Sequence, residues 1–142
     1  MKQFLSLKQM RLLIKLGVNV SHPTYYYIGE IIDGRGRKLR RYDSNYHISM
    51  QKHTMTTGCP QTFEYVPCFS LVDIIEILPK EINIKGDLYY LRIDNDSCTY
   101  AKIGNYCYYD RANYYIVELN ENVIDACYDA LILLLTSKIL NF

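Results

Sequence analysis

The side chains most able to do chemistry form a short run of cations. Five Lys and Arg residues fall within seven positions, namely Arg35, Arg37, Lys38, Arg40 and Arg41. Like charges this close repel one another, and arginine offers a planar fork of N–H donors that fits a phosphate or a carboxylate. An anionic partner would relieve the repulsion. We therefore take residues 35–41, the basic segment, as the candidate binding site for a protein or a nucleic acid with an anionic surface.

Tyrosines lie on both sides of the basic segment. The nearest in the sequence are Tyr25, Tyr26, Tyr27, Tyr42 and Tyr46. An aromatic ring beside arginine can stack on an unpaired base or anchor a protein interface. Tyr25, Tyr27 and Tyr42 are therefore candidate contact residues together with the five cations. The alternative is a solvated hairpin arm whose charges discourage edge-to-edge pairing, with tyrosines that only pack on the strands.

The charge of the chain is divided between its halves. The formal net charge is +1, from 16 Lys+Arg and 15 Asp+Glu. Residues 1–71 hold 10 Lys+Arg and 4 Asp+Glu, a net charge of +6, whereas residues 72–142 hold 6 and 11, a net charge of −5. The near-neutral total hides a dipolar chain, and its positive half carries the basic segment.

Three carboxylates in the negative half recur at helical spacing, at Glu121, Asp125 and Asp129. Each like-charge pair at this spacing costs roughly 0.3 kcal/mol. Glu121 and Asp125 lie near the expected start of a helix, where the helix dipole favours anions. Asp129 lacks that compensation, so a basic partner surface at this position is an open alternative.

Catalytic and metal-binding motifs of high specificity are missing from the sequence. His47, His53 and Cys59 are six residues apart, whereas zinc ligands usually come in close pairs. The segment that starts at Asp94 begins like a calcium loop but has Thr99 where glycine belongs, so it is expected to be a turn. We predict no catalytic residue, no metal site and no cofactor.

The cysteines are the remaining nucleophiles. They are five in number, Cys59, Cys68, Cys98, Cys107 and Cys127, and none forms a C-x-x-C pair. An odd count without paired spacing argues against a disulfide framework, and free cysteines are usually buried. We therefore expect reduced core thiols and no enzyme. A small hydrolase with a Cys/His or a carboxylate site stays open as an alternative, because catalytic residues assemble from distant positions.

Helices are predicted at three places from capping signals and apolar periodicity. Ser6 begins a capping box, and Gly17 suits a left-handed helix end. In chain order, the expected helices span residues 6–17, run from the cap Ser70 to Pro79, and start at the cap Asn120 or Asn122.

Strands are predicted from aromatic and β-branched runs bounded by turn signals. Asp33-Gly34 is a hairpin turn signal that joins the first two runs. The expected strands span residues 24–33, 38–42, 62–66, 81–85, 88–93, 99–103, 106–109 and 114–119, and the rest of 43–66 is expected to be mostly loop.

The order of the elements predicts the fold class. Strands follow one another with turn-length connections and do not alternate singly with helices, which favours an antiparallel sheet over a doubly wound parallel one. We predict an α+β protein with one antiparallel sheet of about five to seven strands, on which an N-terminal, a central and a C-terminal helix pack.

Length and composition bound the organisation of the chain. With 142 residues, 49% of them hydrophobic and 22% charged, the chain is too apolar for disorder and suits one domain over residues 1–142. No apolar run approaches the ~20 residues that cross a bilayer, and the first residues lack the apolar stretch of a secretory signal. We expect a cytoplasmic protein without membrane contact, and the sequence leaves its oligomeric state open.

Five segments carry a likeness to other proteins. They are the opening helix with Leu16-Gly17-Val18, Pro67-Cys68-Phe69-Ser70-Leu71 before the central helix, Tyr89–Ile93, Tyr114–Val117, and Asp125–Tyr128 before the Leu-rich end. In these segments the chain resembles small uncharacterised accessory proteins of phages and integrated elements of Bacteroidota. The basic segment is not part of the shared pattern, and no functional residue carries over.

The resemblance implies a setting for the function. Small phage-like accessory proteins often bind and inhibit a host or defence component. The resemblance therefore implies a non-enzymatic binding protein. One candidate function is inhibition of a nucleic-acid-guided defence nuclease through the basic, Tyr-flanked hairpin. A direct RNA- or DNA-binding accessory protein is the alternative.

Overall fold

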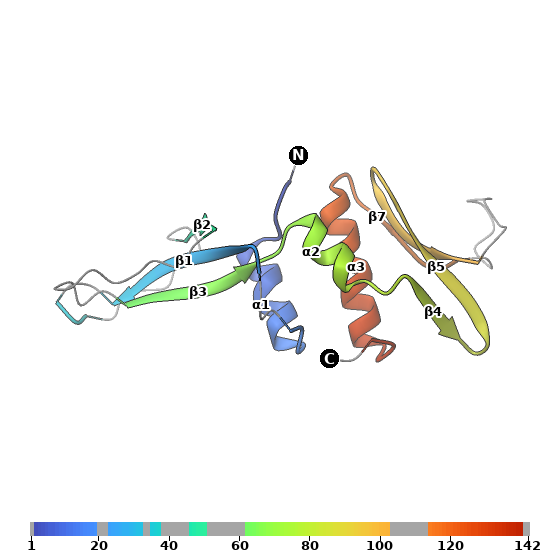
Figure 1. Cartoon of the computed structure of the whole chain (residues 1–142), viewed down its shortest axis with the longest axis horizontal. Helices are drawn as coiled ribbons and strands as arrows, with labels where there is room; N and C mark the ends of the chain where they lie inside the picture. The colour runs from blue at the N-terminus through green and yellow to red at the C-terminus, as the bar shows by residue number, and fades with distance from the viewer. Residues whose placement is uncertain are drawn as a thin grey trace. The chain divides into compact units, whose positions relative to one another are not determined.

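The fold belongs to the α+β class, as predicted. The computed structural model describes residues 2–19, 23–32, 35–37, 46–50, 62–102 and 114–140. These residues form the following elements (Figure 1): α1 (Leu7–Lys15), β1 (Tyr25–Ile32), β2 (His47–Ser49), β3 (Thr62–Cys68), α2 (Leu71–Ile77), β4 (Glu81–Ile84), β5 (Asp87–Asp94), β6 (Ser97–Ala101), β7 (Tyr114–Leu119) and α3 (Val123–Thr136). The predicted strands 38–42 and 106–109 lie outside the described residues.

The seven described strands form two antiparallel sheets, where the sequence predicted one. The first sheet has the order β2-β1-β3 and the second the order β4-β5-β6-β7. The strands of the second sheet pair with their neighbours in the chain, but β1 pairs with β3 across about 30 residues. The prediction of a single sheet was therefore wrong. A hydrophobic pattern in the sequence shows where a strand lies, but tertiary packing selects which distant strand it pairs with.

Two compact units divide the chain. One is Ser6–Phe69, the N-terminal unit, and the other is Met1–Leu5 together with Ser70–Phe142, the C-terminal unit. The N-terminal unit has 9 Lys+Arg and 4 Asp+Glu in its sequence, a net charge of +5, whereas the C-terminal unit has 7 and 11, a net charge of −4. The charge asymmetry of the sequence thus follows the two units. The expectation of one domain over residues 1–142 stays a prediction.

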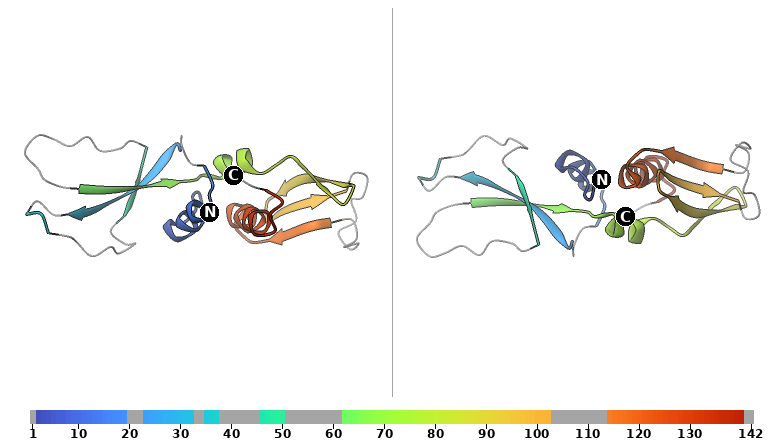
Figure 2. Two further views of the ribbon diagram at one scale, coloured as in Figure 1. Left: turned by 90° about the horizontal axis from the view of Figure 1, so that it is seen from below. Right: turned by 90° about the horizontal axis from the view of Figure 1, so that it is seen from above.

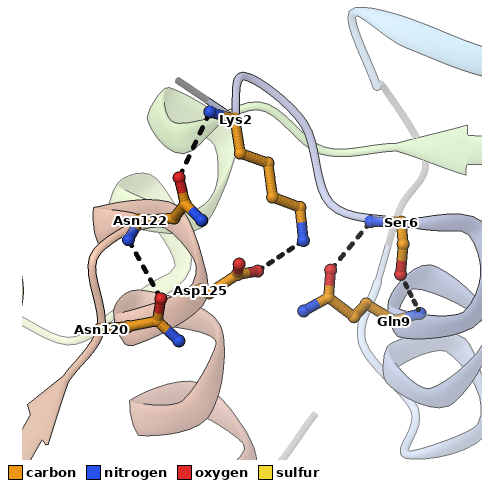
Figure 3. A network of polar contacts seen from close by, with 6 residues as sticks. All are labelled: Lys2, Ser6, Gln9, Asn120, Asn122 and Asp125. Carbon is orange, nitrogen blue, oxygen red and sulfur yellow. Dashed lines mark hydrogen bonds and ion pairs between the residues drawn. The ribbon is translucent and has the colours of Figure 1, made fainter.

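Helix α1 begins and ends where the sequence predicted. The Ser6 hydroxyl accepts from the Gln9 N–H (3.2 Å), and the Gln9 side chain accepts from the Ser6 N–H (2.8 Å), which completes a capping box (Figure 3). At the other end Gly17 has φ +90°, and the Val18 N–H donates to the Leu13 carbonyl at 3.1 Å. This Schellman arrangement satisfies a carbonyl that would otherwise lack a partner.

The sheet of the N-terminal unit is built around β1. Tyr27 of β1 lies opposite Ile48 of β2 on one side and opposite Val66 of β3 on the other. Strand β2 was not predicted, because three residues are too few to show an alternating pattern. Strand β3 continues through Pro67 to Cys68, beyond the predicted end, since a proline without an N–H is tolerated in a strand at the edge of a sheet.

Gly29 in the middle of β1 makes room for an aromatic ring. A Cβ atom at this position would overlap the ring of Tyr46, which precedes β2. The guanidinium carbon of Arg11 lies 5.5 Å from the centre of that ring, and Nη2 of Arg11 lies 3.6 Å from Oε1 of Glu64. Gly29 thus marks a place where another group approaches the strand closely, as glycines within strands often do. The Tyr46 ring fills this space and packs against the sheet.

The sheet of the C-terminal unit is the predicted antiparallel meander. Its first turn, Lys85-Gly86, has positive φ at both residues (53° and 90°), as a type I′ hairpin requires, and the Gly86 N–H donates to the Asn83 side chain at 3.0 Å. Helix α2 begins with the predicted capping box of Ser70 and Asp73, and it packs against α3. Phe4 bridges to Ser70, which joins the first residues of the chain to this unit.

Helix α3 covers one face of this sheet and contacts β5, β6 and β7. Its buried stripe includes Ile124, Cys127, Leu131 and Leu134. Burial of each leucine contributes about 2 kcal/mol to the stability of the unit. Strand β6 lies in the middle, where residues 97–100 are all buried. Cys98 and Tyr100 face α3, and the Tyr100 hydroxyl donates to the Pro79 carbonyl at 2.8 Å.

Among the described helices, none combines the length and the hydropathy that a membrane-spanning helix needs.

The first prediction concerns the close approach of the Tyr46 ring to Gly29. Gly29→Ala is expected to lower the free energy of unfolding by about 1–3 kcal/mol, because its methyl group must displace the Tyr46 ring. The same change in a Tyr46→Ala background should cost nothing or stabilise slightly, since the space is then open. Urea unfolding of the four proteins, followed by circular dichroism, measures this coupling. Equal costs in both backgrounds would contradict the contact.

Candidate functional site

The basic segment is described in part. Arg35 and Arg37 are exposed, and Gly36 between them has φ +78°. They follow the end of β1, so the strand leads the chain to this point. The predicted site residues Lys38, Arg40, Arg41 and Tyr42 lie outside the described residues.

The two described tyrosines of the predicted site lie at the other end of β1. Tyr25 and Tyr27 are at the beginning of the strand, whereas Arg35 and Arg37 come after its last residue. From Tyr27 to Ile32 the strand advances roughly 17 Å, at about 3.3 Å per residue. A small ligand could not contact both groups along this path, but a macromolecular surface could.

Packing accounts for much of the environment of these rings. Tyr27 is half-buried, and burial, followed by the thiol of Cys68, raises the pKa of its phenol. Tyr26, on the opposite face of β1, makes an edge-on contact with Tyr65 at a centroid distance of 6.4 Å. Both rings thus take part in packing of the sheet, and the alternative that they serve only as strand packing stays a prediction.

Comparison of the chain with models of protein families, with curated proteins and with solved structures finds no match in any of the three. The site must therefore be interpreted from its own residues.

A buried pair of thiols lies between the sheet and α3 in the C-terminal unit. Cys98 of β6 and Cys127 of α3 share a side-chain hydrogen bond, and both residues have 0% exposure. That hydrogen bond and burial raise the pKa of Cys98, so its thiol stays protonated. In this conformation no substrate reaches either sulfur. The alternative of a Cys/His or carboxylate hydrolase stays a prediction, since His22 and His53 lie outside the described residues.

Two carboxylates lie on the same side of the sheet as these thiols. Glu118 of β7 is the cross-strand neighbour of Cys98, and Asp129 belongs to α3. Burial raises the pKa of both carboxyl groups; repulsion by Asp129 adds to the shift of Glu118, and repulsion by Asp125 adds to that of Asp129. Sequence patterns could not reveal Glu118, because its neighbour Asp129 lies in another element.

Asp125 differs from Asp129 because it has a partner. Lys2 Nζ lies 2.6 Å from Asp125 Oδ1, and the Lys2 N–H donates to the side chain of Asn122 at 3.4 Å (Figure 3). The predicted cap Asn122 makes no side-chain cap hydrogen bond, and its own N–H donates to Asn120 at 3.0 Å. Asp129, which the sequence left without compensation, has no ion-pair partner among the described residues. The pKa of its carboxyl group is raised, and attraction to Lys2 offsets only part of that rise.

An open groove lies at the turn between β5 and β6. Its volume is about 1150 Å³, and its lining combines apolar Leu71, Ile93 and Val123 with polar Asp94, Asn95, Asp96 and Glu121. Asp94 Oδ2 accepts from Arg92 Nε at 3.1 Å. The turn predicted at residues 94–97 is confirmed. The described residues contain no group of three or more side chains placed to bind a metal ion.

The second prediction concerns the pH dependence of the stability that Glu118 affects. A folded-state pKa above the ordinary value of 4.5 means that ionisation of Glu118 costs stability; the cost is absent at acidic pH and complete above the folded pKa. Glu118→Gln should therefore raise the free energy of unfolding at pH 7 by about half a kcal/mol, the size typical of exposed charge pairs, and should lose this gain at pH 4.

The control for this prediction is Glu81→Gln, the same change at an exposed position of the opposite edge strand, β4. Urea unfolding at both pH values measures the two variants. A gain for Glu118→Gln that is equal at pH 7 and pH 4 would contradict a cost of ionisation that comes from burial and from repulsion by Asp129.

Proposed function

We propose that the protein is a non-enzymatic binding protein whose N-terminal unit engages an anionic surface through the basic segment. The observation that carries the proposal is the exposure of Arg35 and Arg37 beyond the end of β1. Exposed guanidinium groups are accessible to the carboxylates or phosphates of a partner and can form bidentate hydrogen bonds with them.

The charge of the two units supports the same proposal. The N-terminal unit has a net charge of +5, and the C-terminal unit one of −4. A surface of one sign raises the rate of encounter with a partner of the opposite sign and disfavours partners of the same sign. An anionic partner would therefore meet the N-terminal unit first.

A protein partner with an acidic surface is the occupant that we propose. Base stacking on a single strand needs exposed ring faces, but Tyr27, one of the candidate contact residues, is half-buried. Recognition then depends on the guanidinium groups, which bind carboxylates in a bidentate manner. Direct RNA or DNA binding is the second candidate, because phosphates fit the same fork.

The biological setting of the proposal comes from the resemblance to accessory proteins of phages and integrated elements. We place the protein in the cytoplasm of a cell that carries such an element, where it binds and inhibits a host defence component. A nucleic-acid-guided nuclease is one target whose function such binding would block.

The third prediction tests the basic segment. Tagged protein is used to capture partners from host lysate with and without nuclease treatment, and the affinity of the recovered partner is then measured against salt. Arg35→Ala with Arg37→Ala should weaken binding at least tenfold. The matched control is Lys8→Ala with Lys15→Ala, which removes the same charge from exposed positions of α1 in the same unit.

Salt dependence separates the two candidate partners. If phosphates are the contact, the slope of log affinity against log salt for a single-stranded 20-nucleotide RNA should flatten by about 1.4 in the double-arginine variant, because each phosphate contact on a single strand contributes about 0.7. If an acidic protein is the contact, nuclease treatment should leave the captured partner in place. Equal weakening by the arginine and the lysine variants would contradict a site at the basic segment.

A further inference from the structure

Strand β7 forms an edge of the sheet in the C-terminal unit. The order β4-β5-β6-β7 gives β7 one neighbour, β6, and no other described strand pairs with it. Figure 2 shows β7, in orange, at one side of these strands. Edge strands present a row of backbone N–H and C=O groups to which another strand can add.

The backbone groups that face this edge follow from the ladder. The Asn120 N–H donates to the Asp96 carbonyl at 2.9 Å, so these two residues form a hydrogen-bonded pair. Hydrogen-bonded and non-hydrogen-bonded pairs alternate in an antiparallel ladder. The pairs Leu119–Ser97 and Val117–Thr99 are therefore not hydrogen-bonded. The N–H and C=O groups of Val117 and Leu119 point away from β6.

The side chains of β7 leave part of this edge open to pairing. Strand β7 reads YYIVEL and lacks the lysine and proline that often block edge strands, and the register shift of its ladder lies at Tyr100/Ala101, away from Val117 and Leu119. On one face of the sheet, Val117 is 46% exposed and Leu119 is 72% exposed. On the other face, toward α3, Glu118 lies beside Asp129. The edge is thus apolar on one face and anionic on the other.

We propose that this edge binds an extended cationic segment of another protein, which adds to the sheet as a further strand beside β7. Successive side chains of such a segment point to opposite faces. Lys or Arg side chains at alternate positions would meet Glu118 and Asp129, and apolar side chains between them would cover Val117 and Leu119. Backbone hydrogen bonds supply affinity in this mode of recognition, and the alternate side chains supply specificity.

Charge decides between this occupant and a second copy of the chain. Neither Glu118 nor Asp129 has an ion-pair partner among the described residues, so cations on the added strand would gain an interaction there. If two β7 strands paired with each other, each Glu118 would lie within a few residues of the other Glu118. The Glu118 and Asp129 carboxylates of one copy would then repel those of the other.

A synthetic peptide tests the proposal on the full chain. The probe is an eight-residue peptide with blocked ends in which lysine and valine alternate. Its controls are the same peptide with glutamate in place of lysine, and a block peptide of four lysines followed by four valines. We expect saturable binding of the alternating lysine peptide, at least tenfold tighter than either control, with slower hydrogen exchange at the Val117 and Leu119 amides.

Two variants separate strand addition from simple charge attraction. Val117→Pro removes an outward N–H that takes no part in the ladder with β6, and Val117→Ala removes only the side chain. The proline variant should bind the peptide at least tenfold more weakly than the alanine variant. Glu118→Gln with Asp129→Asn should also lower affinity about tenfold, whereas Arg35→Ala with Arg37→Ala should not change it.

Three results would overturn the proposal. The first is equal binding of the alternating and the block peptide, and the second is unchanged exchange at the Val117 and Leu119 amides of the wild-type protein with peptide bound. Both readouts hold whether or not the proline variant folds. The third is self-association of the free protein that Val117→Ala abolishes, because the occupant of the edge would then be a second copy.

Discussion

The C-terminal unit depends on the pairing of β6 with both of its neighbours. This strand is buried over residues 97–100, and its ladder with β7 determines which residues of β7 face α3 and which face away. One register places Ile116 in the core, Glu118 beside Asp129, and the backbone groups of Val117 at the edge. A shift by one residue would exchange all of these positions, so the core and the edge surface are specified together.

The separation of charge follows the division into units. A positive N-terminal unit and a negative C-terminal unit can attract different partners, anionic for the first and cationic for the second. The basic segment and the β7 edge belong to different units and share no residue.

Local signals predicted the elements that obey local rules. The capping boxes at Ser6 and Ser70, the helix end at Gly17 and the turn at Lys85-Gly86 depend on residues within a few positions of one another, so they could be found in the sequence. Strand β2 and the close approach of Tyr46 to Gly29 depend on distant partners and could not. For the candidate site, the sequence indicated the cations and Asp129, but it could not indicate Glu118.

By itself the sequence determined the α+β class, the capped starts of α1 and α2 and the dipolar charge of the chain, because composition, period and capping act over short distances. Only the tertiary structure decided that the strands form two sheets, that Lys2 neutralises Asp125, and that the outward backbone groups of β7 lie between an apolar and an anionic face. These outcomes depend on contacts between residues far apart in the chain, whose energies no local pattern records.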